Sequence, residues 1–183
     1  MKFKKIQLIG FKSFAEKTDF LIEDGLTGIV GPNGCGKSNI VESLRWVMGE
    51  TSAKSMRGSG MEDVIFSGTS NKASKNIAEV IINLENEEKD GPIQYKNIDQ
   101  IEIRRKIEKD KGSKFYINHK EARAKDTQMF FADLSTGAHS PSIISQGRIG
   151  TLVTAKPTDR RAVLEEAAGI SGLHVRRHEA ELR

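Results

Sequence analysis

Apolar and polar residues alternate over two stretches in the middle of the chain. Residues 77–84 place four apolar side chains on one face, and residues 101–104 alternate isoleucine with charged residues. A period of two predicts half-buried β-strands. A turn at residues 109–112 and renewed alternation over 114–117 predict that the second strand belongs to a solvent-facing hairpin. Further strand candidates are residues 3–14, where the strand enters a turn at Gly10, and residues 18–22 and 61–66.

Three other stretches carry the spacing of helices. Apolar residues recur with a helical period over residues 40–47, and Gly49 follows as a candidate C-cap. Residues 126–134 and 158–168 are also predicted to be helical, the latter with Pro157 at its start. With 183 residues, these elements predict one α/β or α+β domain.

A glycine-rich loop joins an apolar run, residues 26–30, to the first predicted helix. The run predicts a buried strand, and residues 31–38 after it satisfy the pattern G-x-x-x-x-G-K-[ST]. The glycines let backbone N–H groups turn toward phosphate oxygens, and the helix N-terminus favours an anion. We therefore expect this loop to hold the phosphates of ATP. Lys37 would bridge the β- and γ-phosphates, and the Ser38 hydroxyl would bind Mg²⁺.

Composition and charge are compatible with a nucleotide-binding domain. The chain is 37% hydrophobic with a net charge of +4, which permits an anionic partner. Cys35 is the only cysteine, so the chain has neither an internal disulfide nor a cysteine-based zinc site. No stretch approaches the roughly 18 apolar residues of a membrane span. We expect a soluble, cytoplasmic protein with no membrane partner.

The Walker B aspartate that completes the magnesium site of many phosphate-loop ATPases is not evident. Residues 129–133 form an apolar run that ends in Asp133, but no acid follows, and the spacing fits an amphipathic helix better. We expect the chain to bind ATP and to lack part of the hydrolytic machinery.

Several blocks of sequence resemble the SMC (structural maintenance of chromosomes) proteins, specifically the N-terminal half of a bacterial SMC head. The blocks follow one another along essentially the whole chain, which makes the resemblance more specific than the loop alone. They are residues 9–14, 31–40, 45–50, 56–58, 61–66, 143–149 and 165–170.

The resemblance implies an α/β fold of the P-loop NTPase class. It would be an ABC-type head lobe with a mixed sheet, a P-loop helix and a flanking antiparallel β layer. Residues 1–168 would form the ATP-binding lobe, and residues 169–183 would begin a C-terminal coiled-coil helix. Walker B and the signature motif of such heads lie in a C-terminal half that this chain does not contain. The fragment would therefore be inactive alone.

The resemblance also implies roles for single residues. Gln146 is similar to the Q-loop glutamine, which joins the Mg²⁺ shell, and Arg57 is similar to an arginine near the γ-phosphate. A polar loop residue and a solvated arginine are the respective alternatives. Lys12 would approach the phosphates and Asp63 the adenine, although both are equally compatible with a surface position. Lys37, Gln146 and Arg57 would be catalytic, and the loop residues contacting nucleotide would be Pro32, Asn33, Gly34, Cys35, Gly36, Lys37, Ser38 and Asn39.

Basic residues are concentrated in residues 96–125, which hold ten Lys or Arg and five Asp or Glu. Composition alone favours an ordinary solvated hairpin. The resemblance implies instead that Arg123 and Lys125 contact phosphates of double-stranded DNA, without sequence preference.

The function implied by the resemblance is that of a chromosome condensation and segregation ATPase on the nucleoid. It would use ATP and Mg²⁺, join the C-terminal half of its own head, engage a second head, and bind DNA and a kleisin subunit. Two alternatives stay open. One is a DNA-repair ATPase of the RecN or RecF type, and the other is a nucleotide-binding module without catalysis of its own.

Overall fold

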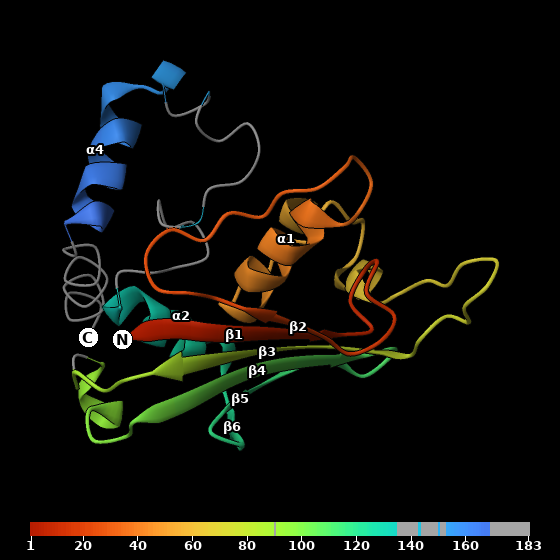
Figure 1. Ribbon diagram of the computed structural model, residues 1–183, viewed down its shortest axis with the longest axis horizontal. Helices are drawn as coiled ribbons and strands as arrows, with labels where there is room; N and C mark the ends of the chain where they lie inside the picture. Colours follow the sequence, from red (N-terminus) through yellow and green to blue (C-terminus); the bar gives the residue numbers. More distant parts are fainter. Residues whose placement is uncertain (90, 135–142, 144–149, 151–152, 169–183) are drawn as a thin grey trace.

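A six-stranded sheet forms the body of the computed structural model (Figure 1). The strand order is β2-β1-β3-β4-β5-β6, and every neighbouring pair is antiparallel. The structure describes residues 1–89, 91–134, 143, 150 and 153–168. The strands are β1 (Lys2–Ile9), β2 (Thr18–Leu21), β3 (Ile77–Glu85), β4 (Gln100–Glu108), β5 (Gly112–Ile117) and β6 (Lys120–Ala122).

Helix α1 (Lys37–Val47) lies across one face of this sheet (Figure 1). Helix α2 (Ala124–Asp133) follows the last strand, and α4 (Pro157–Ala167) lies away from the sheet. Within the described ranges, no helix is both long and apolar enough to cross a membrane. Short 3-10 turns are η1 (Lys54–Met56), η2 (Met61–Val64) and η3 (Ile93–Tyr95).

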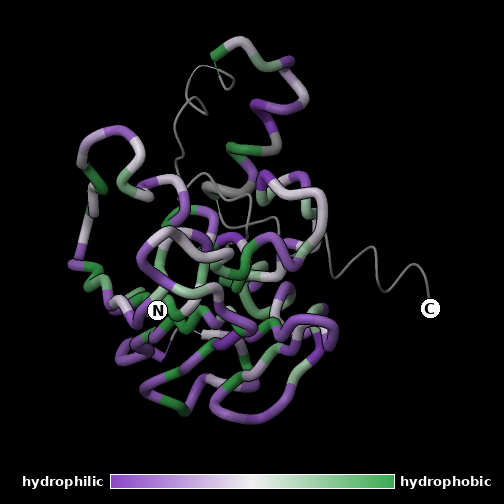
Figure 2. Tube along the Cα trace, turned by 90° about the vertical axis from the view of Figure 1, so that its right-hand side faces the viewer, coloured by the Kyte–Doolittle hydropathy of each residue, from purple (hydrophilic) through white to green (hydrophobic). Residues whose placement is uncertain are grey.

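The core lies between α1 and the sheet. Alternate residues of β3 and β4 are buried on the side of α1, while the other face of these strands is partly exposed and largely polar. Figure 2 shows hydrophobic segments gathered at the centre and hydrophilic ones at the turns. Trp46 of α1 is fully buried, and its ring packs on that of Phe11 with centroids 5.4 Å apart. Truncation of such a buried aromatic costs about 3–5 kcal/mol.

The period-two and period-3.6 patterns were good predictors. Strands β1 to β5, the hairpin turn between β4 and β5, and helices α1, α2 and α4 form where they were expected. The segment 129–133 lies within α2, as its helical spacing predicted. The α/β class and the antiparallel layer are confirmed.

Two predicted strands are wrong. Residues 61–66 form the turn η2, in which the Asp63 carboxylate accepts backbone hydrogen bonds from Ser59 and Gly60, and only Ile65 makes a bridge, to Phe11. Residues 26–30 form no strand and are exposed. A strand needs a neighbour for its N–H and C=O groups, and the described residues offer this run none. The expected mixed sheet is therefore not formed within the described part of the chain.

Candidate nucleotide-binding site

The phosphate loop ends in a left-handed glycine that starts α1. Gly36 is the N-cap, with φ of 93°, and Gly34 also has a positive φ, of 83°. A Cβ at Gly36 would lie 2.7 Å from Ser13 Oγ and 3.3 Å from Phe14 Cζ. Both the conformation and the space therefore require glycine at the last position before the helix.

Lys37 folds its side chain back over this loop. Its Nζ donates to the carbonyl oxygens of Gly31, at 2.6 Å, and Pro32, at 2.5 Å, and lies 3.9 Å from Cys35 Sγ. The first N–H groups of α1 have no acceptor one turn earlier in the helix and carry the positive end of the helix dipole. An ammonium and several N–H groups thus converge at one place, and this donor set suits the oxygens of a phosphate chain.

A broad groove of about 1100 Å³ runs from Lys37 and Ser38 along α1. Arg57 also lines it, so three of the predicted site residues share one groove. Its other wall is the segment around residues 20–30, which is mainly apolar. The Ser38 hydroxyl, at the start of α1, fits the role of a Mg²⁺ ligand by its chemistry.

A network of charged and polar side chains lies beside the loop. Arg57 Nη2 donates to Asn39 Oδ1 at 2.9 Å, and Asn39 Nδ2 donates to Ser13 Oγ at 2.9 Å. Arg57 Nε also pairs with the carboxylate of Glu42, and Lys12 Nζ pairs with the other oxygen of the same carboxylate. The network therefore brings two of the predicted residues, Arg57 and Lys12, against α1.

Lys12 and Asp63 have structural partners. Lys12 Nζ donates to the Met56 carbonyl as well as to Glu42, and its side chain is 13% exposed. Asp63 Oδ2 accepts from the Ser59 N–H at 2.6 Å and the Gly60 N–H at 3.0 Å. The hydrogen bonds from Gly60 and Ser59 hold the pKa of Asp63 below its usual value. A contact of either residue with nucleotide stays a prediction.

The two predicted DNA contacts are not at the loop. Gln146 lies outside the described residues. Arg123 and Lys125 lie at the start of α2, and Gln128 of this helix donates to the Gly49 carbonyl, beyond the end of α1 opposite Lys37. The guanidinium of Arg123 makes two bonds to Asp126, at 3.0 and 2.9 Å, so part of its charge is already compensated.

A buried arginine anchors the far end of α1 to the sheet. Arg105 of β4 is 3% exposed, and its Nη1 donates to the carbonyls of Trp46, at 2.7 Å, and Glu50, at 2.6 Å. Its guanidinium lies 4.4 Å from the Trp46 ring centroid. Burial lowers the pKa of Arg105 to about 10, but the group stays charged at neutral pH and faces the negative end of the helix dipole.

Sequence reasoning missed Glu42, Ser13 and Arg105. A signal for Glu42 exists, because it follows Ser38 by four residues and therefore projects from the same side of the helix as the loop hydroxyl. Its partners are distant in sequence and could not be named from spacing.

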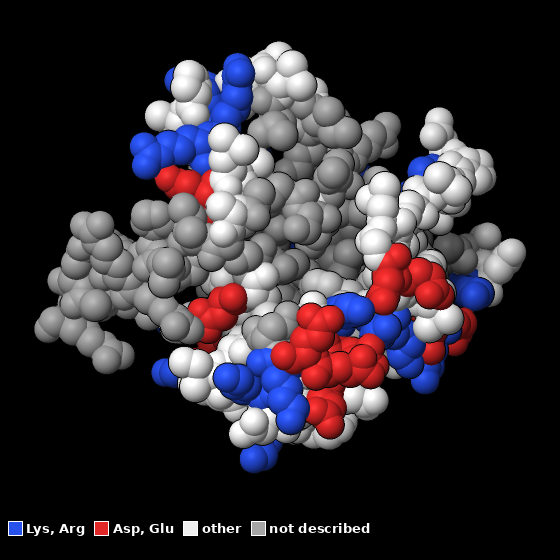
Figure 3. Space-filling model, turned by 60° about the vertical axis from the view of Figure 1, so that its left-hand side comes forward, with Lys and Arg blue, Asp and Glu red and all other residues white. Residues whose placement is uncertain are grey.

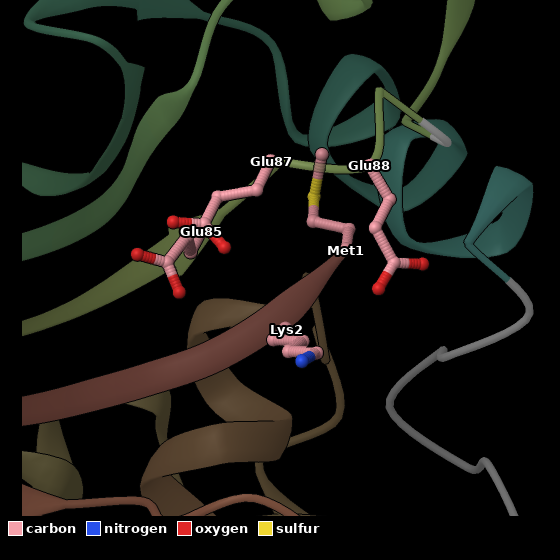
Figure 4. A pocket seen from close by; sticks show the side chains of 5 residues that line it. All are labelled: Met1, Lys2, Glu85, Glu87 and Glu88. Carbon is pink, nitrogen blue, oxygen red and sulfur yellow. The ribbon is translucent and has the colours of Figure 1, made fainter.

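A second, smaller hollow lies where β1 begins and β3 ends, lined by Met1, Lys2, Glu85, Glu87 and Glu88 (Figure 4). Three carboxylates around it would repel phosphate. Among the described residues, no group of three or more His, Cys, Asp or Glu side chains is arranged to hold a metal ion.

Comparison with known proteins shows the family of the chain. The family model for the RecF/RecN/SMC N terminal domain matches residues 2–147. The chromosome partition protein Smc of Rhodopseudomonas palustris is 55% identical over all 183 residues, and that of Cereibacter sphaeroides is 57% identical over the same length. The chain spans 16% of the length of each of these relatives.

Solved SMC structures share the fold. An SMC head bound to the C-winged helix domain of ScpA matches with a TM-score of 0.83 and 33% identity, over 93% of this chain and 52% of that one. A chain from work on ATP-driven dimerization and DNA stimulated activation of SMC ATPases matches with a TM-score of 0.78 and 31% identity, over 91% of this chain and 99% of that one. The chain therefore belongs to the RecF/RecN/SMC N-terminal domain family, in which these relatives and neighbours are SMC proteins.

Proposed function

We propose that the chain is the ATP-binding N-terminal lobe of an SMC head that serves chromosome condensation and segregation. The observation that carries the proposal is the position of Lys37, whose ammonium is held over the glycine loop at the N-terminus of α1. From this position the ammonium would turn from those carbonyls to the β- and γ-phosphates of ATP, while the helix N–H groups bind the phosphate oxygens.

Other residues of the chain then act on the same nucleotide. Ser38 and Gln146 would hold Mg²⁺, which supplies charge neutralisation between the phosphates. Arg57 lines the same groove as Lys37 and compensates charge near the γ-phosphate. The backbone of residues 32–39 surrounds the phosphates. Lys12, which pairs with Glu42, would add positive charge near the phosphates. Asp63 would contact the adenine.

The exposed apolar run supports a partner for the lobe, which we propose to be the C-terminal half of the same head. Leu26 is 97% exposed and Val30 92%, and Leu21 at the edge of β2 is 70% exposed. These side chains flank the groove along α1. Large exposed apolar patches mark interaction sites, and an extended, unpaired backbone adds strands readily. The partner would complete the mixed sheet and supply Walker B and the signature motif.

In the proposed assembly the head engages a second head through ATP, and it also binds DNA and a kleisin subunit. The assembly would act on the nucleoid in the cytoplasm. The solved neighbours provide the support, since one is bound to ScpA and another comes from a study of ATP-driven dimerization. Figure 3 shows acidic and basic side chains interspersed on one face of the molecule. Contacts of Arg123 and Lys125 with DNA would therefore be local phosphate contacts that salt weakens.

Equilibrium binding of MgATP to the wild type and to Lys37→Ala tests the proposal. Loss of a charge-assisted contact to phosphate should weaken binding at least about tenfold. Lys72→Ala removes an exposed lysine in a turn and is the matched control, for which we expect unchanged affinity. Equal affinity of the wild type and Lys37→Ala would reject the proposed role of the loop.

A further inference from the structure

The carboxylate of Glu42 is buried between two cations beside the phosphate loop. Its side chain is 9% exposed, and its two oxygens are divided between Arg57 Nε and Lys12 Nζ. A buried carboxylate is costly unless it is paired, so this position is maintained by the two cations. Because a carboxylate repels phosphate, Glu42 has a different role from the groups that bind phosphate.

The direction of the Arg57 side chain is set by α1. Arg57 follows η1 with a left-handed backbone, φ 54°, and its side chain is 57% exposed. Its partners in the described structure are Glu42, at Nε, and Asn39, at Nη2. Asn39 and Glu42 are three residues apart and therefore lie on one side of the helix. Two neighbouring nitrogens of the guanidinium are thus held, while Nη1 has no acceptor among the described residues.

We propose that Glu42 is a positioning residue that orients Arg57 toward the γ-phosphate. The inference rests on the proposed function, because it needs nucleotide in the groove that Lys37, Glu42 and Arg57 all line. Glu42 binds Nε and Asn39 binds Nη2, which leaves Nη1 to an anionic oxygen. A fork of fixed geometry loses less entropy when it binds than a free one.

The charge of Glu42 gives the proposal a distinctive signature. An anion beside the groove opposes the binding of ATP in the ground state, although it orients the arginine needed in the transition state. Replacement of Glu42 by glutamine removes one negative charge next to Lys12 and Arg57. The substitution should therefore leave KM for ATP unchanged or lower it, while kcat falls. A general loss of folded protein does not lower KM.

Steady-state ATP turnover by the intact protein that carries this chain tests the proposal. We expect Glu42→Gln to lower kcat about tenfold without raising KM. Arg57→Ala should lower kcat at least as much, and the double variant should be no slower than Arg57→Ala alone, because both changes remove one function. Glu79→Gln is the matched control. It cuts a partly buried ion pair with Arg104, 3.4 Å long, on strand β3, and both kcat and KM should stay within about twofold.

Glu42→Gln leaves Lys12 buried without its counter-charge, and this could reduce folding. Comparison of Lys12→Met with Lys12→Met/Glu42→Gln removes that difficulty, since neither variant buries an unpaired lysine. The same tenfold loss of kcat is expected between these two variants.

The outcomes separate the inference from the proposed function. Independent, multiplicative losses for Glu42→Gln and Arg57→Ala, or a raised KM in Glu42→Gln, would overturn the positioning role while leaving ATP binding intact. ATP turnover by the Lys37→Ala variant at the wild-type rate would overturn the proposed function and the inference together.

Discussion

The anchor at the far end of α1 makes the strongest stability prediction. Arg105→Met keeps most of the volume of the side chain and removes its guanidinium. The change removes one donor from the carbonyl of Glu50 and one from that of Trp46, which keeps the Gly49 N–H at 3.2 Å. It also removes a bond of 2.9 Å from Arg105 Nε to Ser113 Oγ. It also removes the stacking of the guanidinium on Trp46 and on Phe115, at 4.4 and 4.5 Å.

Two opposing contributions decide the magnitude. Hydrogen bonds that involve a charged group contribute about 1.5–3 kcal/mol each, and Arg105 makes three of them. Burial of the charge opposes folding, because it lowers the pKa of Arg105 to about 10, and a shift of this size corresponds to about 3 kcal/mol. The net effect of Arg105→Met should be a loss of about 3 kcal/mol in the free energy of unfolding.

Chemical denaturation of the wild type, Arg105→Met and Arg104→Met measures this loss. Arg104 is the adjacent residue of β4, pairs with Glu79 on the partly exposed face and stacks on Tyr116. Its replacement should cost less than about 1 kcal/mol. For a chain of this size, the Arg105 variant should melt roughly 6–12 °C lower. Equal losses for the two variants would refute the conclusion that Arg105 anchors α1.

Three further predictions concern the loop and its surroundings. Gly36→Ala should cost several kcal/mol and abolish nucleotide binding, as judged by denaturation and by MgATP titration, because its Cβ would collide with Ser13 Oγ in a left-handed conformation. Asp63→Asn should destabilise the chain at pH 7, and the difference from the wild type should vanish as the pH falls below about 4. The folded state lowers the pKa of Asp63, so the carboxylate contributes to the free energy of unfolding only above that range. A difference that is constant with pH, in urea titrations between pH 3 and 7, would contradict this. Leu26→Ser should leave the stability of the isolated chain within about 0.5 kcal/mol, since the side chain is 97% exposed, but should weaken association with the C-terminal half of the head in a pull-down with purified partner.

Local sequence determined the elements that are half buried. In β3 and β4 the alternation is visible because one face meets α1 and the other meets solvent. The glycine loop before α1 was equally predictable in its geometry, because Gly36 and the start of α1 belong to one continuous segment. The C-cap of α1 is Met48, and Gly49, predicted as the C-cap, follows it with a φ of 104°.

Interactions between distant segments could not be predicted. Residues 26–30 have the apolar pattern of a buried strand, but pairing depends on a neighbour that a local pattern does not name. The same limit applies to Glu42, whose partners Lys12 and Arg57 come from other segments. Arg105 interrupts the isoleucines of β4 and is charged, so its burial follows only from the position of the α1 carbonyls above it.

A crystal structure of the chain with MgATP tests the central claim most directly. The account predicts that the triphosphate lies at residues 31–38 and that Lys37 Nζ leaves the carbonyls of Gly31 and Pro32 to bind the β- and γ-phosphates, with Ser38 on the Mg²⁺ ion. Nucleotide bound elsewhere, or phosphates at the loop with Lys37 still on the two carbonyls, would contradict it.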